Sequence, residues 1–331
     1  MTLRHVRPSF RPSHLAQVTS LQSIRAWLQT GIRQAELTGD SSEFARVQRI
    51  GGLLYHIGGC LGESNTASFE RMWRQNTAKY LHLTTVVQPL LKNLDGEVVW
   101  LKGADYVENL YGDPGARQMA DLDLLVSPRA LTQLTSELTT EHRIRSRTAT
   151  ELGVEINGGL IEFHSQVGLQ TQSTIDPGAI LRRSIQRRIN GCDYAFPTDL
   201  DRLLIWLTNQ SKAAFIDGLW AYVDLVLILK KLLKAPGGHQ WDTVKAHVDD
   251  ARLSTAFALA LMRLDEFEIW PFEALPISTK RADRWRLSLT EASTPEKLAP
   301  MWKRQALILA LSRTRMLPTA ALHLLGKTLG R

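Results

Sequence analysis

The sequence predicts an α+β protein in which a small module of strands and helices lies between two helical regions. In the first and last thirds of the chain, apolar residues recur three and four positions apart, as in amphipathic helices. In the middle third, short β-branched and aromatic runs alternate with turn signals, which is typical of strands. We therefore expect a helical domain over residues 15–94, an α/β core over 95–197 and a helical domain over 198–331.

The composition excludes disordered and fibrous proteins. The chain has 331 residues, of which 44% are hydrophobic and 22% are charged, and this length predicts more than one domain. Its two cysteines have no partners at metal-ligand spacing, so neither a disulfide framework nor a structural zinc site is indicated. We expect a cytoplasmic protein, since no stretch resembles a signal peptide or reaches the ~20 apolar residues of a transmembrane helix.

The formal net charge of +7 comes from the end of the chain. Residues 281–331 contain ten Lys or Arg and three Asp or Glu, whereas the first 280 residues are balanced. Apolar runs within the basic segment from Lys297 to Arg331 favour packed helices with a basic outer face. Such a face suits either the phosphates of RNA or peripheral contact with lipid.

The middle module begins after a turn signal with a strand over residues 97–101. Lys102-Gly103 ends this strand and opens a short helix over 104–111, which a loop follows up to residue 120. A helix N-terminus that directly follows a strand presents free backbone N–H groups that suit phosphate. Lys102 and Gly103 are therefore candidate nucleotide-binding residues.

A second strand is expected over residues 121–126, followed by a helix to about residue 138 that Ser127 caps. Two more strands, near 153–156 and over 160–167, flank an Asn-Gly-Gly sequence that indicates a hairpin. In the last region, Thr198 begins a helix as part of a capping box. Helices are expected there up to residue 234 and over residues 240–250, 251–269 and 300–328.

Carboxylates on these strands predict a metal site. Alternation along a strand places Asp121 and Asp123 on one face and their leucine neighbours in the core. The same alternation places Glu162 and His164 on one face of a later strand. If the two strands are neighbours, the three carboxylates surround a site for two divalent ions ~3.5–4 Å apart. His164 is expected to be a hydrogen-bonded structural residue.

Three charged residues outside these strands are further candidates for binding the nucleotide. Arg117 lies in the loop four residues before Asp121, where a guanidinium suits phosphate oxygens, although taken alone such an arginine is more often a solvated loop charge. Asp224 is the only charge in a long apolar stretch of helix and needs a partner, either polar groups of a substrate or an internal Arg or Lys. Lys212, just before that helix, is a weaker candidate for phosphate.

Together, the segments Leu101–Gly103, Leu110–Val126 and Ile161–His164 resemble a bacterial nucleotidyltransferase family of the polymerase-β-like superfamily. Its pattern is an LKG turn, a tyrosine, an arginine four residues before a DxDLLV strand, and later an acidic residue two before a histidine. The motifs lie within residues 98–167, about a fifth of the chain.

The resemblance implies a mixed-sheet core in which Asp121, Asp123 and Glu162 hold Mg²⁺ or Mn²⁺ and a nucleoside triphosphate, ATP among the candidates, is the substrate. The sequence departs from the superfamily in two ways. Ala104 follows Gly103 where serine is usual, and 17 residues separate Gly103 from Asp121, which is more than the typical gap. Contact between a hydroxyl and the triphosphate is thus in doubt, and Lys102 or Arg117 would substitute for it.

We therefore expect an enzyme that moves a nucleoside monophosphate from a triphosphate to a small molecule, a peptide or a protein. A second hypothesis keeps this chemistry but takes RNA as the acceptor, as in toxins with a similar core that modify tRNA ends. A third is a non-catalytic nucleotide-binding or scaffold protein with the same fold. No motif specifies the base or the acceptor.

Overall fold

The computed structural model describes residues 22–28, 45–46, 48–58, 63–92, 94, 98–138, 143–168, 174–189, 192–213, 215, 217–234, 241–266 and 269. The helix expected over 300–328 and the basic segment from Lys297 lie outside these residues. Among the described helices, none is long and apolar enough to cross a membrane.

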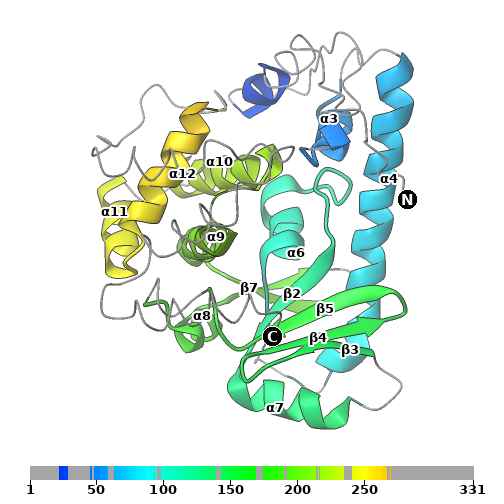
Figure 1. Ribbon diagram of the computed structural model, residues 1–331, viewed down its shortest axis with the longest axis vertical. Helices are drawn as coiled ribbons and strands as arrows, with labels where there is room; N and C mark the ends of the chain where they lie inside the picture. The colour runs from blue at the N-terminus through cyan, green and yellow to red at the C-terminus, as the bar shows by residue number, and fades with distance from the viewer. Residues whose placement is uncertain are drawn as a thin grey trace, which may run out of the picture.

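A five-stranded mixed sheet forms the centre of the middle module (Figure 1). Its strands, in spatial order, are β1 (Val98–Trp100), β2 (Asp121–Val126), β5 (Gly159–His164), β4 (Glu151–Ile156) and β3 (Arg143–Arg147). β2 and β5 pair in parallel, whereas the other three pairs are antiparallel. This arrangement confirms the predicted α+β class and its mixed sheet.

Local sequence explains how β4 and β5 form a hairpin. Asn157 and Gly158 connect them with φ angles of 48° and 79°, the left-handed backbone of a tight hairpin turn. The alternation in β2 buries Leu122 and Leu124 on one face of the sheet, and Asp123 projects from the other. One face of the sheet is thus apolar and the other carries the acidic residues.

Two helices cover the apolar face of the sheet. Tyr80 and Leu83 of α4 (Glu63–Val86) and Leu131 and Leu134 of α7 (Pro128–Glu137) share a hydrophobic cluster with the inward residues of β2, β4 and β5. The Ser127 hydroxyl accepts from the Ala130 N–H at 3.1 Å, so the predicted N-cap of α7 is confirmed. This packing fixes the orientation of the sheet and directs its polar face away from α4.

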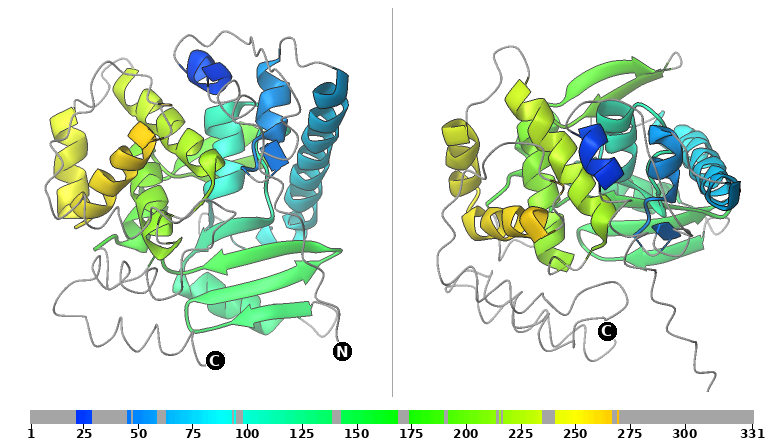
Figure 2. Two further views of the ribbon diagram at one scale, coloured as in Figure 1. Left: turned by 45° about the horizontal axis from the view of Figure 1, so that its top comes forward. Right: turned by 90° about the horizontal axis from the view of Figure 1, so that it is seen from above.

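Of the remaining described helices, α5 (Gln88–Leu91) packs against the same apolar cluster through Leu90 and Leu91, and Ala104 and Val107 also belong to that cluster. A short helix, α6 (Lys102–Tyr106), continues into a π-helical turn, η1 (Val107–Tyr111). It lies between α4 and α10 in the view of Figure 1 and in the view from above in Figure 2. The other described helices are α3 (Gly51–Ile57), α8 (Pro177–Arg182), α9 (Asp199–Ala213), α10 (Leu219–Lys234), α11 (Trp241–Asp250) and α12 (Ser254–Glu266). Residues 22–28, α3 and α9 to α12 share a second hydrophobic cluster. The division into three domains stays a prediction.

Three strands are missing from the expectations drawn from sequence. β3 has the sequence Arg-Ile-Arg-Ser-Arg and lies at the edge of the sheet, where most of its side chains are exposed. Its sequence therefore lacks the apolar alternation of a half-buried strand. β6 (Ile185–Ile189) and β7 (Cys192–Phe196) form a separate two-stranded hairpin. The sequence of β6 also contains two arginines and is largely exposed. Patterns based on burial do not detect strands whose side chains mostly face solvent.

Candidate active site

The polar face of the β2–β5 pair brings together the acidic residues that the sequence singles out. In the parallel register Asp123 lies opposite Glu162, and Asp121 lies one pleat earlier on the same face. Asp123, Glu162 and His164 each offer one ligand atom, and these three atoms all lie within 4.8 Å of one another. Two carboxylates and an imidazole at this spacing are suited to hold one divalent cation.

A lysine ammonium lies against the same cluster. Lys102 Nζ donates to Oδ1 of Asp123 at 2.6 Å, and His164 Nε2 lies 3.0 Å from the same oxygen. His164 Nε2 is also 3.5 Å from a carboxylate oxygen of Glu162. The backbone of Lys102 has a φ of 45°, which is uncommon for a residue other than glycine. This left-handed residue starts α6 at the end of β1, directly beside β2.

These contacts separate the proton affinities of the two aspartates. Burial and then the neighbouring Asp123 charge raise the pKa of Asp121 to about 6, although Lys102 opposes this shift. Burial acts in the same direction on Asp123, but Lys102 and His164 outweigh it and hold its pKa below the usual range. Burial tends to lower the pKa of His164, yet its hydrogen bonds to Asp123 and Glu162 raise it. The site therefore concentrates negative charge that a cation would neutralise.

A cavity of about 250 Å³ opens beside the two aspartates. It lies between the sheet, α6 and the helices α9 and α10. Its lining combines charged, amide and aromatic side chains: Arg49, Lys102, Tyr106, Arg117, Gln118, Asp121, Asp123, Trp206, Asn209, Gln210, Asp217, Trp220 and Asp224. A cavity with polar groups and aromatic faces beside a set of metal-ligand atoms is a typical substrate site.

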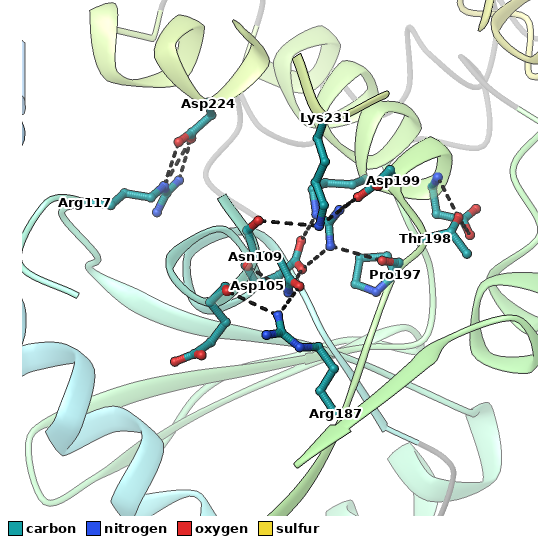
Figure 3. A network of polar contacts seen from close by, with 12 residues as sticks. Asp105, Asn109, Arg117, Arg187, Pro197, Thr198, Asp199, Asp224 and Lys231 are labelled. Atoms are coloured by element: carbon teal, nitrogen blue, oxygen red, sulfur yellow. Dashed lines mark hydrogen bonds and ion pairs between the residues drawn. The ribbon is translucent and has the colours of Figure 1, made fainter. Parts of the chain in front are cut away.

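The predicted residues Arg117 and Asp224 pair with one another in the wall of this cavity. Three hydrogen bonds of 2.8–3.1 Å join the guanidinium to the Asp224 carboxylate (Figure 3). Tyr111 at the end of η1 adds a hydrogen bond to Asp224 at 2.8 Å. The Arg117 guanidinium also lies 5.0 Å from the ring centres of Tyr106 and Trp220. The partner of Asp224 is thus an internal arginine.

Gly103 lies where Arg117 and Met119 approach the backbone. A Cβ atom at this position would be 2.9 Å from Met119 Cγ and 3.0 Å from Arg117 Nη1. Both distances are shorter than nearly all real Cβ contacts. A larger residue here would push Met119 and the Arg117 guanidinium away, so Gly103 lets the Arg117 side chain lie close to α6.

A second buried ion pair fixes α6 to α9. Arg202 donates two hydrogen bonds of 2.7 Å to the carboxylate of Asp105, and both side chains are buried (Figure 3). Asn109 donates to Asp105 at 2.9 Å, and Arg187 of the β6–β7 hairpin donates to Asn109 at 2.6 Å. The network spans residues from α6 to α9 and holds the start of α6, and with it Lys102, in place.

The loop before β2 is tied to the N-terminal helices. Asp113 accepts from the Trp73 indole at 3.0 Å and from the Gly115 N–H at 2.8 Å, and its other oxygen lies 2.6 Å from Nδ1 of His56. A Cβ on Gly115 would overlap the Trp73 ring, so glycine is required there. Helices α3 and α4 therefore help to place the loop that carries Arg117.

Lys212 lies in a second, smaller cavity of about 80 Å³. Thr150, Glu151 and His164 also line this cavity, while Lys102 and Asn209 line both cavities. Lys212 is half-buried and makes no ion pair with any residue that the structure describes. The two cavities thus share Lys102 and Asn209 in their walls, and Lys212 does not line the larger one.

The structure therefore divides the residues predicted from sequence into groups. One group forms the acidic cluster: Asp121, Asp123, Glu162 and Lys102. A second group lines the adjacent cavity: Gly103, Arg117 and Asp224. Lys212 lines only the smaller cavity. Sequence reasoning missed three features: the ligand geometry of His164, the aromatic face of Trp220, and Arg49. Of these, His164 alone had a signal, since it stands two residues after Glu162 on the same strand face.

Comparison with known proteins identifies the family. The profile of a family described as uncharacterised nucleotidyltransferase matches residues 40–267, more than half of the chain. The chain belongs to this nucleotidyltransferase family. The match includes every predicted site residue and both cavities, and it confirms the resemblance that the motifs indicated.

One solved structure is similar to this nucleotidyltransferase at a low level. It is an antigenic nucleotidyltransferase-like protein from Paracoccidioides brasiliensis, with 16% identity and a TM-score of 0.31. The alignment covers 62% of this chain and 95% of that protein. No curated protein sequence matches this chain. The family assignment therefore rests on the family profile.

Proposed function

We propose that this nucleotidyltransferase catalyses metal-dependent transfer of a nucleoside monophosphate from a nucleoside triphosphate to an acceptor. The observation that carries the proposal is the cluster of Asp123, Glu162 and His164 ligand atoms within 4.8 Å, beside a polar cavity that Asp121 and Asp123 help to line. Phosphoryl transfer requires positioned cations and anions more than covalent chemistry from the protein. The site supplies both kinds of charge.

The donor atoms fit a divalent cation. Asp121, Asp123 and Glu162 supply hard carboxylate oxygens, which suit Mg²⁺ or Mn²⁺, and His164 supplies a nitrogen that Mn²⁺ accepts more readily than Mg²⁺. A cation bound there would neutralise phosphate charge and activate the attacking oxygen. Burial and then the neighbouring Asp123 charge raise the pKa of Asp121 to about 6, and a bound cation would favour its ionised form.

The chain's own residues would position the triphosphate. Lys102 lines both cavities and carries a charge next to Asp123, so its ammonium is within reach of phosphate oxygens in either cavity. Arg117 is committed to Asp224, and we assign the pair to shaping and orienting the cavity. Gly103 lets Met119 and the Arg117 guanidinium approach the start of α6, next to Lys102.

The proposed transfer is a substitution at the α-phosphorus of the triphosphate. An oxygen of the acceptor forms a bond to the α-phosphorus, the bond from that phosphorus to the β-bridging oxygen breaks, and pyrophosphate leaves with the bonding electrons. The proton of the acceptor hydroxyl passes to a carboxylate of the cluster, for which Glu162 is the candidate because it is more exposed than Asp123. Placement of the two reactants provides much of the acceleration.

The acceptor is a small molecule, a peptide or a protein in the first hypothesis. RNA is the alternative acceptor, and a nucleotide-binding protein without catalysis is the other alternative. The basic segment that would favour RNA lies outside the described residues, so no described contact favours RNA over the other acceptors. These alternatives are outcomes of one experiment.

The experiment uses the full chain with each α-labelled nucleoside triphosphate, Mg²⁺ or Mn²⁺, and a lysate fractionated into RNA, protein and small molecules. We expect label in one fraction, and at least a hundredfold less with Asp123→Asn. Glu155→Gln is the matched control, since Glu155 pairs with Arg145 on β3 and lines neither cavity. Label in no fraction, with nucleotide binding retained, would favour the non-catalytic alternative. Equal labelling by Asp123→Asn would contradict the proposed site.

A further inference from the structure

One cationic side chain of the larger cavity makes no ion pair with any carboxylate among the described residues. Three cations line it, and two of them already have partners: Lys102 pairs with Asp123, and Arg117 pairs with Asp224. Arg49 is the third. Within the part of the chain that the structure describes, Arg49 forms no ion pair with any Asp or Glu. Its charge is thus available to a ligand.

Local contacts place Arg49 at the cavity although its side chain is exposed. The buried side chain of Gln48 accepts a hydrogen bond of 2.8 Å from the Leu219 N–H at the start of α10. Arg49 follows with a left-handed φ of 56°, and its guanidinium carbon lies 5.8 Å from the centre of the Trp220 ring. Anchoring at Gln48 and contact with Trp220 therefore restrict where this charge can lie.

A continuous series of contacts joins the metal-ligand cluster to Arg49. Lys102 contacts Asp123, and the next residue, Gly103, lies against the guanidinium of Arg117. Arg117 and Arg49 both contact the ring of Trp220. A triphosphate whose α-phosphorus lies beside the two aspartates would extend its outer phosphates along this wall.

We infer that Arg49 binds the β- and γ-phosphates of the nucleotide, the part that leaves as pyrophosphate. A guanidinium matches phosphate oxygens in a two-pronged geometry, and the outer phosphates carry most of the charge of the substrate. The inference rests on the proposed function, because it takes a nucleoside triphosphate as the ligand of this cavity. It adds the N-terminal region to the site.

Calorimetric titration tests the inference without turnover. The ligands are a triphosphate analogue with a methylene bridge between the α- and β-phosphates, and inorganic tripolyphosphate, each with Mg²⁺. We expect Arg49→Gln to weaken both by roughly ten- to a hundredfold, the loss for one charged hydrogen-bonding group. Arg49→Lys keeps the charge and is expected to weaken both by less.

Arg252→Gln is the matched control. Arg252 is also exposed, has a φ of 60° and donates its N–H three residues back, as Arg49 does, yet it lines neither cavity. The control therefore reproduces the backbone cost of replacing a left-handed arginine. We expect it to bind both ligands as the wild type does.

Three results would overturn the inference. Unchanged affinity of Arg49→Gln for both ligands would exclude a contact with phosphate. A loss for the nucleotide analogue alone would place Arg49 beside the nucleoside. If the wild type binds neither ligand and Asp123→Asn labels acceptors as well as the wild type does, the proposed function itself fails. Far-ultraviolet circular dichroism of each variant separates these results from misfolding.

Discussion

Arg117 and Asp224 lie 107 residues apart in the sequence and form a buried ion pair joined by three hydrogen bonds. The pair links the loop before β2 to the middle of α10, and each side chain lines the larger cavity. Since both charges are removed from water, each one stabilises the other, and neither is easily replaced alone.

Removing one member of the pair should cost stability, because a buried charge remains. We expect Arg117→Met to lower the free energy of unfolding by about 3–5 kcal/mol. The double variant Arg117→Met/Asp224→Leu should regain most of it, as an apolar pair replaces an ionic one. Unfolding by urea measures both. A single variant that keeps full stability but loses nucleotide affinity would instead assign Arg117 to direct contact with substrate.

His164 should be a ligand of the bound cation. Electron spin-echo modulation of bound Mn²⁺ detects a directly coordinated nitrogen, and we expect this signal in the wild type and its loss in His164→Gln. The measurement requires no turnover and no acceptor. His82→Gln is the control, since the imidazole of His82 on α4 contacts the backbone of Asn157 away from the cluster. If the wild type shows no nitrogen signal, His164 is not a ligand, and the result would favour the hydrogen-bonded structural role expected from the sequence.

Asp121 should make the metal-free protein less stable at neutral pH. Its pKa is raised from 3.8 to about 6, so the folded state holds this proton more tightly than the unfolded state. Ionisation between pH ~4 and ~6 therefore lowers the free energy of unfolding. We expect Asp121→Asn to be more stable than the wild type by about 3 kcal/mol at pH 7 and equally stable near pH 4.

Urea titrations with a chelator present, at pH 4.5, 5.5 and 7, measure this difference. Addition of Mn²⁺ should stabilise the wild type at pH 7 more than Asp121→Asn, because the cation neutralises the ionised carboxylate. A wild type that is more stable than the variant at pH 7 without metal would contradict the raised pKa.

Lys102 should compete with the cation for Asp123. Its ammonium lies 2.6 Å from the carboxylate oxygen that also faces His164. Without that positive charge, the cluster should bind Mn²⁺ more tightly, by about tenfold, while affinity for a triphosphate falls. Lys102→Met tests this by calorimetry, with Lys212→Met in the smaller cavity as control. Weaker Mn²⁺ binding by Lys102→Met would show that the lysine instead supports the metal site.

The sequence was sufficient for the part of the site that lies on strands. Alternation alone placed Asp121 and Asp123 on one face, and the same rule placed Glu162 with His164. The sequence analysis had to assume that the two strands are neighbours. The structure shows that β2 and β5 pair in parallel, which brings the two sets of residues together. Strand periodicity is local, so a single sequence shows it well.

Contacts between distant helices were beyond sequence reasoning. The charge of Asp224 in an apolar stretch showed that it needs a partner, but nothing in one sequence selects Arg117 over any other arginine. Arg49 and Trp220 carried no signal, since their roles come from how α10 packs beside the N-terminal region. The edge strand β3 was missed because its arginines face solvent. Such features depend on tertiary packing, which a local pattern does not contain.

The two members of the Arg117–Asp224 pair are synthesised at different times. The strands that carry the ligand atoms leave the ribosome first, whereas Asp224 follows Arg117 by 107 residues, roughly 5 to 20 s of translation. In the part of that interval after His164 has been made, the nascent chain contains the residues of the acidic cluster but lacks α10, Trp220 and a counter-ion for Arg117. Half-made chains would therefore attract cations before any nucleotide pocket exists, and the pocket would close only when the last third of the protein arrives.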